Sequence, residues 1–595
     1  MPENQTKKTG SRIALSVIIT LVLIGIYYYC RLPALNLRNP SFYTFIFLCL
    51  VLYTIVSMIC FGAVTGKSNI TIKDYLSFAK TQCKYVVIIL AALAAIFLLG
   101  ELISLPILRA GSYNKLLEVR TGDFASEVQQ VSFEEIPMLD ESSAQRLGTK
   151  KLGELSDMVS QFEVALDYTQ INYQNRPVRV ASLEYGDVFK WFFNRKEGLP
   201  AYVMVDMVTQ EVEVIRLSSL NETGMKYSPS EYFSRDLNRT LRFRYPTYMF
   251  SVPHLEIDES GQPFWVCPRE TRSIGLFGGR NVVGAVLLNA STGESVYYDA
   301  SEVPTWVDRV YGATLITEQY NYYGTYVNGW INSIIGQKDV TVTTSGYNYI
   351  AMNDDVYMYT GITSVSSDNS NIGFLLSNQR TKETTYYAAP GATEGSAQES
   401  AMGVVQDLGY TATFPLLLNI AGHPTYFMSL KDSSDLVKMY AMVNVAQYQI
   451  VSTGNTVASC ENNYIALLAQ NKIDVSHAIP DSIMDARTNN TGTIAEIRSA
   501  VMDGNSYYFI RLDGESVFYS ISAAKNSIVV ILNVGDTVKI QAAPDSAGNS
   551  SILEAYSISK PGAEPEVKPE PTPEPTPPAP TTPETAPTAQ PITGA

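Results

Sequence analysis

The sequence predicts an N-terminal α-helical transmembrane region, followed by α+β repeats (helix plus antiparallel hairpin) and by a small all-β barrel. Three observations lead to this fold class: a long apolar N-terminal region, a hairpin-like segment that recurs in the middle of the chain, and five short strand patterns near the end. At 595 residues the chain exceeds the roughly 250 to 300 residues that one hydrophobic core can serve. Several domains are therefore expected.

Three apolar segments near the N-terminus are long enough to cross a membrane. Uncharged runs of eighteen and twenty-eight residues cover 13–30 and 39–66, and a third run, 85–108, contains one charge, Glu101. At 1.5 Å per residue each can span a hydrocarbon layer of about 30 Å. The first run could also be a cleaved signal peptide, but no A-x-A site follows it. We expect a retained anchor and a three-helix transmembrane region over residues 1–108.

Positive charges around these spans predict their orientation. Seven Lys or Arg residues precede the first span or lie between the second and the third, whereas only Arg31 and Arg38 lie between the first and the second. Such charges favour the cytoplasmic side, so the N-terminus is predicted to be cytoplasmic. Three crossings then place the large C-terminal region outside the cytoplasm. We expect a multi-pass cell-membrane protein that has the lipid bilayer as a partner.

The region after residue 108 is acidic and poor in cysteine. It holds 55 acidic and 34 basic residues, and the whole chain has a formal net charge of −15. Nucleic acid is an unsuitable partner for such a surface, because phosphate binding needs clustered cations. Only Cys267 and Cys460 lie in this region. They could form a disulfide or remain two buried thiols, and the sequence leaves both alternatives open.

Three segments, 201–217, 284–300 and 373–389, share one pattern. Each has an apolar strand, an Asp or Asn, a Thr three residues later, a Glu two residues further, and a second strand. The aligned positions are Asp206, Thr209 and Glu211; Asn289, Thr292 and Glu294; and Asn378, Thr381 and Glu383. A degraded fourth copy has Asn444 at the turn. Asp and Asn accept backbone N–H bonds in turns, so each copy predicts a β-hairpin.

Helical patterns accompany these hairpins. A helix is predicted near Asp140 and Ser142, and amphipathic runs lie at 186–198, 230–243 and 396–410. A helix and a hairpin in alternation indicate small α+β units, in which a helix packs on an antiparallel sheet.

The hairpin pattern, above all STGES at 291–295, resembles the closing hairpin of PepSY-type modules, which are small α+β domains of bacterial envelope and protease-associated proteins. This resemblance implies a role in modulating or inhibiting a peptidase. The chain as a whole resembles uncharacterised membrane proteins of Firmicutes, and that resemblance implies no particular function.

The C-terminal part predicts a barrel and a tail. Residues 492–558 contain five short strands and resemble an OB-fold barrel. Five bases against seven acids over 491–560 argue against single-stranded nucleic acid as its ligand. The proline-rich end is predicted to be disordered. The expected boundaries are a transmembrane region (1–108), a first helix-rich and PepSY-like unit (109–220), a second unit (221–310), a third and a fourth unit (311–485), an OB-like barrel (486–560) and the tail (561–595).

No pattern in the chain indicates catalysis, a cofactor or a metal. His254, His423 and His477 are the three histidines, and none stands in a metal-ligating or nucleophile-activating motif. Each is expected to be exposed or to bond to backbone. The sequence GLFGGRN at 275–281 could wrap a phosphate, but a tight hairpin turn is the favoured interpretation.

Tyrosine is the one enriched residue type that suggests binding. Tyr320, Tyr322, Tyr323 and Tyr326 cluster within thirteen residues, where they could contact a glycan or a protein, or simply pack in the fold. The expected function is non-catalytic binding or scaffolding in the cell envelope, with an envelope protein, a peptide or a cell-wall polymer as partner. The alternatives are a PepSY-like regulator or inhibitor of an envelope peptidase and an envelope hydrolase with an unrecognised site.

Overall fold

The computed structural model of the chain describes residues 3–65, 77, 80, 84–130, 136–220, 222–352, 354–365, 370–475, 488–502, 505–523, 526–544 and 552–559. The chain divides into two compact units, Met1–Ile479 and Pro480–Ala595. The predicted disordered tail (561–595), His477 and most of the lysine-containing loop after the second span lie outside the described residues.

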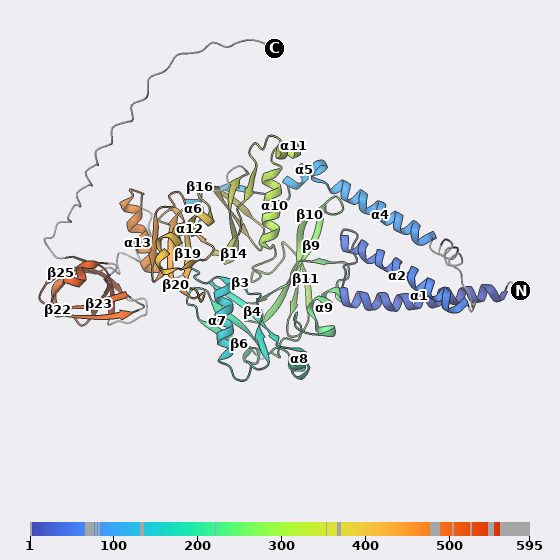
Figure 1. The fold of residues 1–595 in the computed structure, drawn as a ribbon, viewed down its shortest axis with the longest axis horizontal. Coiled ribbons are helices and arrows are strands. Elements are labelled where there is room, and N and C mark those ends of the chain that lie inside the picture. Colours follow the sequence, from blue (N-terminus) through green and yellow to red (C-terminus); the bar gives the residue numbers. More distant parts are fainter. Residues whose placement is uncertain are drawn as a thin grey trace, which may run out of the picture. The chain divides into compact units, whose positions relative to one another are not determined.

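Three long helices at the start of the first unit confirm the predicted apolar spans. They are α1 (Glu3–Arg31), α2 (Pro40–Thr65) and α4 (Lys84–Ser104). Each contains a segment of 18 to 21 residues that is long and apolar enough to cross a membrane. Figure 1 shows them as separate long helices that lead to the β-rich part of the unit.

The tip of one β-hairpin contacts the ends of these spans. The Ser104 Oγ, at the end of α4, accepts hydrogen bonds from the backbone N–H groups of Leu276 and Phe277, each at 3.0 Å. The Phe277 ring packs against Phe97 of α4 and Tyr43 of α2, with centroids 5.1 and 5.5 Å apart. The segment at 275–281 therefore belongs to the predicted hairpin turn, and this turn fastens the β-rich part to the spans.

The rest of the first unit is built from four antiparallel sheets that share one topology. In each sheet two short strands pair with the same third strand, which continues through a fourth and a fifth strand as a meander. The first sheet has β2 (Phe162–Val164), β3 (Thr169–Tyr173), β4 (Arg176–Tyr185), β5 (Ala201–Asp206) and β6 (Val212–Arg216). The second has β7 (Met249–Phe250), β8 (His254–Ile257), β9 (Pro263–Ile274), β10 (Gly278–Asn289) and β11 (Ser295–Asp299).

The third sheet has β12 (Thr341–Thr343), β13 (Asn348–Met352), β14 (Asp355–Ser364), β15 (Ser370–Asn378) and β16 (Thr384–Ala392). The fourth has β17 (Thr411–Ala412), β18 (Leu416–Ile420), β19 (His423–Lys431), β20 (Val437–Asn444) and β21 (Val451–Gly454). The third sheet alone gains a sixth strand, β1 (Arg120–Gly122), which pairs in parallel with β16.

A helix precedes each sheet in the sequence, which agrees with the expected alternation of helix and strands. These helices are α7 (Glu141–Gly153), α9 (Leu237–Arg244), α10 (Ala313–Thr325) and α12 (Glu394–Val404). The run at 186–198 forms α8 (Val188–Asn194), but α8 connects β4 to β5 inside the first sheet and does not lead it. Among the described residues the remaining α-helices are α5 (Pro106–Asn114), α6 (Phe124–Glu127), α11 (Gly329–Ile334) and α13 (Val457–Gln470).

The recurring Asp/Asn-Thr-Glu pattern makes the same turn in three of the sheets. Asp206, Asn289 and Asn378 each accept two backbone N–H bonds, from the second and third residues that follow, at 2.8 to 3.0 Å. In each turn the Thr hydroxyl accepts the N–H of the Glu at 3.2 to 3.3 Å. In the fourth sheet Asn444 accepts a single bond, from the N–H of Gln447. The turn chemistry predicted from the sequence is confirmed.

Successive sheets share apolar cores. Val286 and Leu288 of β10 join the core of the first sheet, whereas their neighbour Leu287 joins a core that includes Leu375 of β15. Phe374, also on β15, lies in a further core with the fourth sheet. The second and third sheets are thus buried on both faces, so the four sheets form one packed series.

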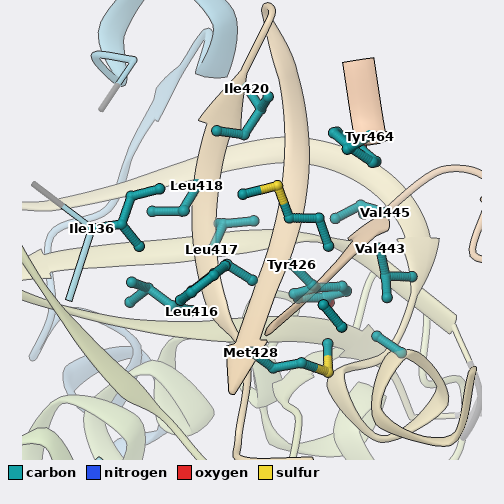
Figure 2. Close-up of a cluster of buried hydrophobic side chains, with 14 of the residues drawn as sticks. Ile136, Leu416, Leu417, Leu418, Ile420, Tyr426, Met428, Val443, Val445 and Tyr464 are labelled. Atoms are coloured by element: carbon teal, nitrogen blue, oxygen red, sulfur yellow. The ribbon is translucent and has the colours of Figure 1, made fainter. Parts of the chain in front are cut away.

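The core around the fourth sheet combines residues from distant parts of the chain. Figure 2 shows Ile136 beside Leu416 and Leu418 of β18, while Tyr426 of β19 lies with Val443 of β20 toward the opposite side. The buried side chains of α12 and α13 complete this core.

The second unit is a closed barrel of five strands with its own apolar core. Its strands are β22 (Thr488–Met502), β23 (Asn505–Leu512), β24 (Phe518–Ser522), β25 (Thr537–Pro544) and β26 (Ile552–Ser559). They pair around the barrel in the order β22-β23-β24-β26-β25, and only the β24–β26 pair is parallel. The five strands predicted from the sequence are present.

Cys267 and Cys460 are unpaired and fully buried, in two different cores. Burial raises the pKa of both thiols, that of Cys460 to about 12. Of the two alternatives that the sequence left open, the structure has the two buried thiols, which are poor nucleophiles in the folded state because the thiolate is the reactive form.

Gly293 lies in the turn between β10 and β11, and replacing it tests the geometry of that turn. It has φ +75°, and a Cβ there would meet the Tyr227 ring at 2.2 Å. We expect Gly293→Ala to destabilise the fold by about 1 to 3 kcal/mol, through backbone strain and overpacking. Gly153→Ala is the matched control, because a Cβ at this exposed end of α7 meets nothing within 4 Å. Thermal unfolding of the purified chain in detergent should show a lower melting temperature for the first variant only; equal values would contradict the assignment.

Candidate functional site

A cavity of about 520 Å³ lies where residues of the first three sheets meet. Its walls come from the start of α7, from β3 and β4, from the segment that begins β8, from the segment that leads into α10, and from the start of β13. These pieces are far apart in the sequence and are brought together by the packing of successive sheets. The volume suits a small molecule or the end of a larger one.

Arg179 of β4 supplies a buried positive charge to this cavity. It alternates with Val178 and Val180, which are in the apolar core, so its side chain leaves the opposite face of the strand. Only 6% of Arg179 is exposed. The guanidinium makes two long hydrogen bonds of 3.4 Å, to the Tyr168 carbonyl and to Gln170 Oε1, and its Nε has no partner. Burial lowers the pKa of Arg179, while the nearby Glu141 charge acts to raise it.

A second arginine, Arg309, also lines the cavity and is half-buried. Within the part of the chain that the structure describes, its guanidinium takes part in no hydrogen bond or ion pair. Its backbone is held firmly, because the Arg309 N–H donates to Glu256 Oε1 at 3.1 Å and the Asp308 N–H donates to Glu256 Oε2 at 2.8 Å. Glu256 is completely buried, so this carboxylate is an anchor for the segment that carries Arg309.

His254 also contacts the Glu256 carboxylate. Its Nε2 lies 2.9 Å from Glu256 Oε1, and its Nδ1 has no partner although the residue is 99% buried and lines the cavity. The sequence interpretation expected His254 to be exposed or bonded to backbone, and this was wrong: it pairs with a carboxylate. The signal was present as His254-Leu255-Glu256, because residues two apart on a strand point to the same face.

Two buried tyrosines, Tyr168 and Tyr349, contribute to the cavity wall. The Tyr168 hydroxyl has no partner and lies against Gly148 of α7, and burial raises its pKa. Burial also raises the pKa of Tyr349 to about 12, while the charges of Arg309 and Arg179 act in the opposite direction. The two arginines therefore act electrostatically on the same phenol.

The acidic side chains that line the cavity are either bonded to another residue or exposed. Burial tends to raise the pKa of Asp140, but hydrogen bonds from Lys431 and Ser143 outweigh it and leave the pKa lowered. The Lys431 Nζ lies 2.6 Å from Asp140 Oδ1, so this carboxylate already has a partner. Glu141 and Asp167 are exposed. The deep part of the cavity is consequently richer in unpaired hydrogen-bond donors than in acceptors.

The four tyrosines singled out in the sequence lie on α10 and at its end, away from this cavity. Tyr320 is 3% exposed and belongs to an apolar core. Tyr322 and Tyr326 stack at 6.2 Å, and both pack against Tyr113 of α5. Tyr323 is half-buried beside Tyr320. A role for the partly exposed members in binding stays a prediction.

The other histidines differ from His254. His423 Nε2 lies 2.7 Å from the Asp474 carbonyl, in line with the expected backbone bond, and His477 is outside the described residues. Among the described residues no group of three or more His, Cys, Asp or Glu side chains could hold a metal ion. In comparison with known proteins, the sequence matches no protein-family model and no curated protein.

The variant Glu256→Gln tests whether the Glu256 carboxylate holds the segment that carries Arg309. The amide keeps the shape of the side chain but offers one accepting oxygen where three donors converge, so at least one donor loses its acceptor, at a cost of about 1 to 3 kcal/mol. We expect a lower melting temperature and faster hydrogen exchange at the N–H groups of Asp308 and Arg309. Glu259→Gln is the control, because Glu259 is exposed on the following turn. Unchanged exchange in Glu256→Gln would show that the carboxylate does not hold this segment.

Proposed function

We propose that the protein is a membrane-anchored, extracytoplasmic binding protein of the cell envelope, and that its ligand occupies the cavity beside Arg179 and Arg309. The observation that carries this proposal is the convergence of buried polar groups without partners on one cavity. Buried polar groups normally find hydrogen-bond partners, and a cavity with several unsatisfied ones is a candidate binding site.

The charge distribution and the contacts of the spans support the extracytoplasmic placement. The Arg242 Nε donates to the Leu32 carbonyl just after α1, at 2.9 Å, and Ser104 at the end of α4 receives the hairpin tip. The β-rich part thus lies at the ends of α1 and α4 that are opposite to the lysine-rich side of the membrane. If that lysine-rich side is cytoplasmic, the cavity faces the envelope.

The second unit fits a structural or protein-binding role. The strand order, with a parallel pair between the third and the fifth strand, supports an OB-type barrel, and we propose that type for it. Its acidic balance agrees with a partner other than nucleic acid.

Two other functions have specific support. The repeated helix-and-hairpin units with their Asp/Asn-Thr-Glu turns favour a PepSY-like regulator of an envelope peptidase. The His254–Glu256 pair beside the cavity favours a hydrolase, because a carboxylate that orients a histidine is a common arrangement in general-base catalysis. Glu256 also accepts two backbone N–H groups, which gives it a structural task and makes binding the better-supported function.

Sidedness can be tested with a single new thiol. Ser301 is exposed and lies after β11. In a Cys30→Ser background, Ser301→Cys should react with a membrane-impermeant maleimide in intact cells that express the chain. The parent without the new thiol is the control, because Cys267 and Cys460 are buried. Labelling of Ser301→Cys only after permeabilisation would overturn the extracytoplasmic placement.

Gly312→Trp tests the cavity as the binding site. Gly312 lines the cavity, has φ −67°, and offers open space to a Cβ, so an indole should fill the cavity without backbone strain. Purified full-length protein is titrated with short peptides and with fragments of cell-wall glycan. We expect at least one class to bind, to be recovered intact, and to bind at least tenfold more weakly to Gly312→Trp.

The matched control is Gly403→Trp, at an exposed position of α12 where a Cβ also meets nothing. It should bind as the parent does. Absence of binding to the parent, or equal binding by Gly312→Trp, would contradict the proposal, and conversion of the ligand would replace it with the hydrolase.

A further inference from the structure

The cavity holds two guanidinium groups, and the Glu141 and Asp140 charges act on one of them, Arg179, without a direct bond. Neither Arg179 nor Arg309 forms an ion pair with any described residue, although both line the same cavity. Arginine stays protonated in proteins, so a buried guanidinium cannot avoid its desolvation cost by losing a proton. Such groups are normally paired, because an uncompensated buried charge destabilises the fold.

The two arginines also repel each other. The Arg309 charge acts to lower the pKa of Arg179, in the same direction as burial. Asp140 cannot serve as a counter-ion without giving up Lys431, to which it is bonded through both oxygens. Two like charges therefore lie at one cavity of a chain whose net charge is −15, and Glu141 offsets part of the Arg179 charge.

The N-terminus of α10 adds positive potential to the same wall. Gly312, Ala313 and Thr314 line the cavity, and Gly312 is an N-cap residue that makes no side-chain cap. The first N–H groups of a helix have no partners within the helix and favour an anion. This 13-residue helix begins beside Arg309, which places its N-terminus and a guanidinium within one short stretch of chain.

The remaining wall is aromatic. Tyr347, Tyr349 and Phe414 line the cavity along with the polar groups. Rings of this kind pack against the flat or apolar part of a ligand. The cavity therefore combines two guanidinium groups with a surface suited to a ring or a short apolar chain.

From this combination we propose that the cavity binds a small organic anion, whose carboxylate or phosphate group is held by Arg179, Arg309 and the N-terminus of α10, and whose ring or apolar part lies against Tyr347 and Tyr349. The inference rests on the proposed binding function and names the class of ligand. The planar guanidinium is suited to both groups, because its parallel N–H donors match two oxygens of a carboxylate or a phosphate.

Matched pairs of probes test the inference on the full-length protein in detergent. Phenyl phosphate is compared with phenol, and benzoate with benzamide, by isothermal titration and by thermal unfolding. We expect at least one anion to bind and to raise the melting temperature, with its neutral counterpart at least tenfold weaker. The stronger of the two anions identifies the group as phosphate or carboxylate.

Arg309→Gln is the informative variant, because the half-buried guanidinium makes no contact that folding would lose. We expect it to weaken binding of the anion by about tenfold or more, since a charge-assisted hydrogen bond is removed. The melting temperature of the empty variant should not fall, because a like-charge repulsion is relieved. Arg309→Lys should restore part of the affinity, and Arg195→Gln, at an exposed arginine outside the cavity, should have no effect.

The outcomes separate this inference from the function on which it rests. If phenol or benzamide binds as well as its anion and Gly312→Trp blocks both, the cavity is a binding site and only anion recognition is wrong. If Arg309→Gln binds the anion like the parent, or if neither anion binds at 10 mM, the inference is overturned. A loss of stability in Arg309→Gln that matches its loss of affinity would also overturn it, because the arginine would then be structural.

Discussion

The sharing of apolar cores between consecutive sheets is the constraint on which the first unit depends. Leu287 faces one core and its neighbour Leu288 faces another, and the same holds for Leu375 and Phe374 in the next sheet. A strand buried on both sides cannot alternate apolar and polar residues, which explains the nearly continuous apolar runs of β10 and β15. Each internal sheet supplies half of two cores, so its removal would expose apolar faces on both neighbours. The repeated units therefore depend on one another for stability, as in repeat proteins generally.

The cavity lies where this apolar packing is interrupted by charge. Arg179 takes a position on β4 between two core valines, and Glu256 takes one on β8 with 0% exposure. Glu256 offsets its burial by accepting three donors, two of them from the backbone that presents Arg309. Arg179 has no comparable compensation. At this cavity the buried Glu256 carboxylate is satisfied and holds a segment in place, whereas Arg179 and Arg309 face open volume without an ion pair to any described residue.

Sequence reasoning could reach the features that depend on local chemistry. The three spans follow from length and charge, and the hairpin turns follow from side chains such as Asn289, which bonds to backbone two and three residues away. The common five-stranded topology could not be predicted from the sequence, because strands as short as Met249–Phe250 carry no periodicity. In addition, β1 pairs with a strand more than 250 residues later. The cavity was missed for the same reason, since its walls come from stretches of chain that are spread between Asp140 and Phe414. In the tyrosine cluster, helical spacing places Tyr320 and Tyr323 on one side of α10. The structure buries Tyr320 in an apolar core.

An acidic protein with a cationic cavity must recognise an anion at short range. The chain has 58 acidic and 43 basic residues, so its overall field repels anions, and at physiological salt that field is screened beyond about 8 Å. Within the cavity, burial and fixed donors strengthen each electrostatic contact, and Glu256 already fixes the backbone that carries Arg309. Without a ligand the buried Arg179 charge is only partly compensated, and a bound anion would complete the compensation. Ligand binding and stability of the first unit are therefore linked through the same two arginines, and the specificity of the site comes from burial rather than from net charge.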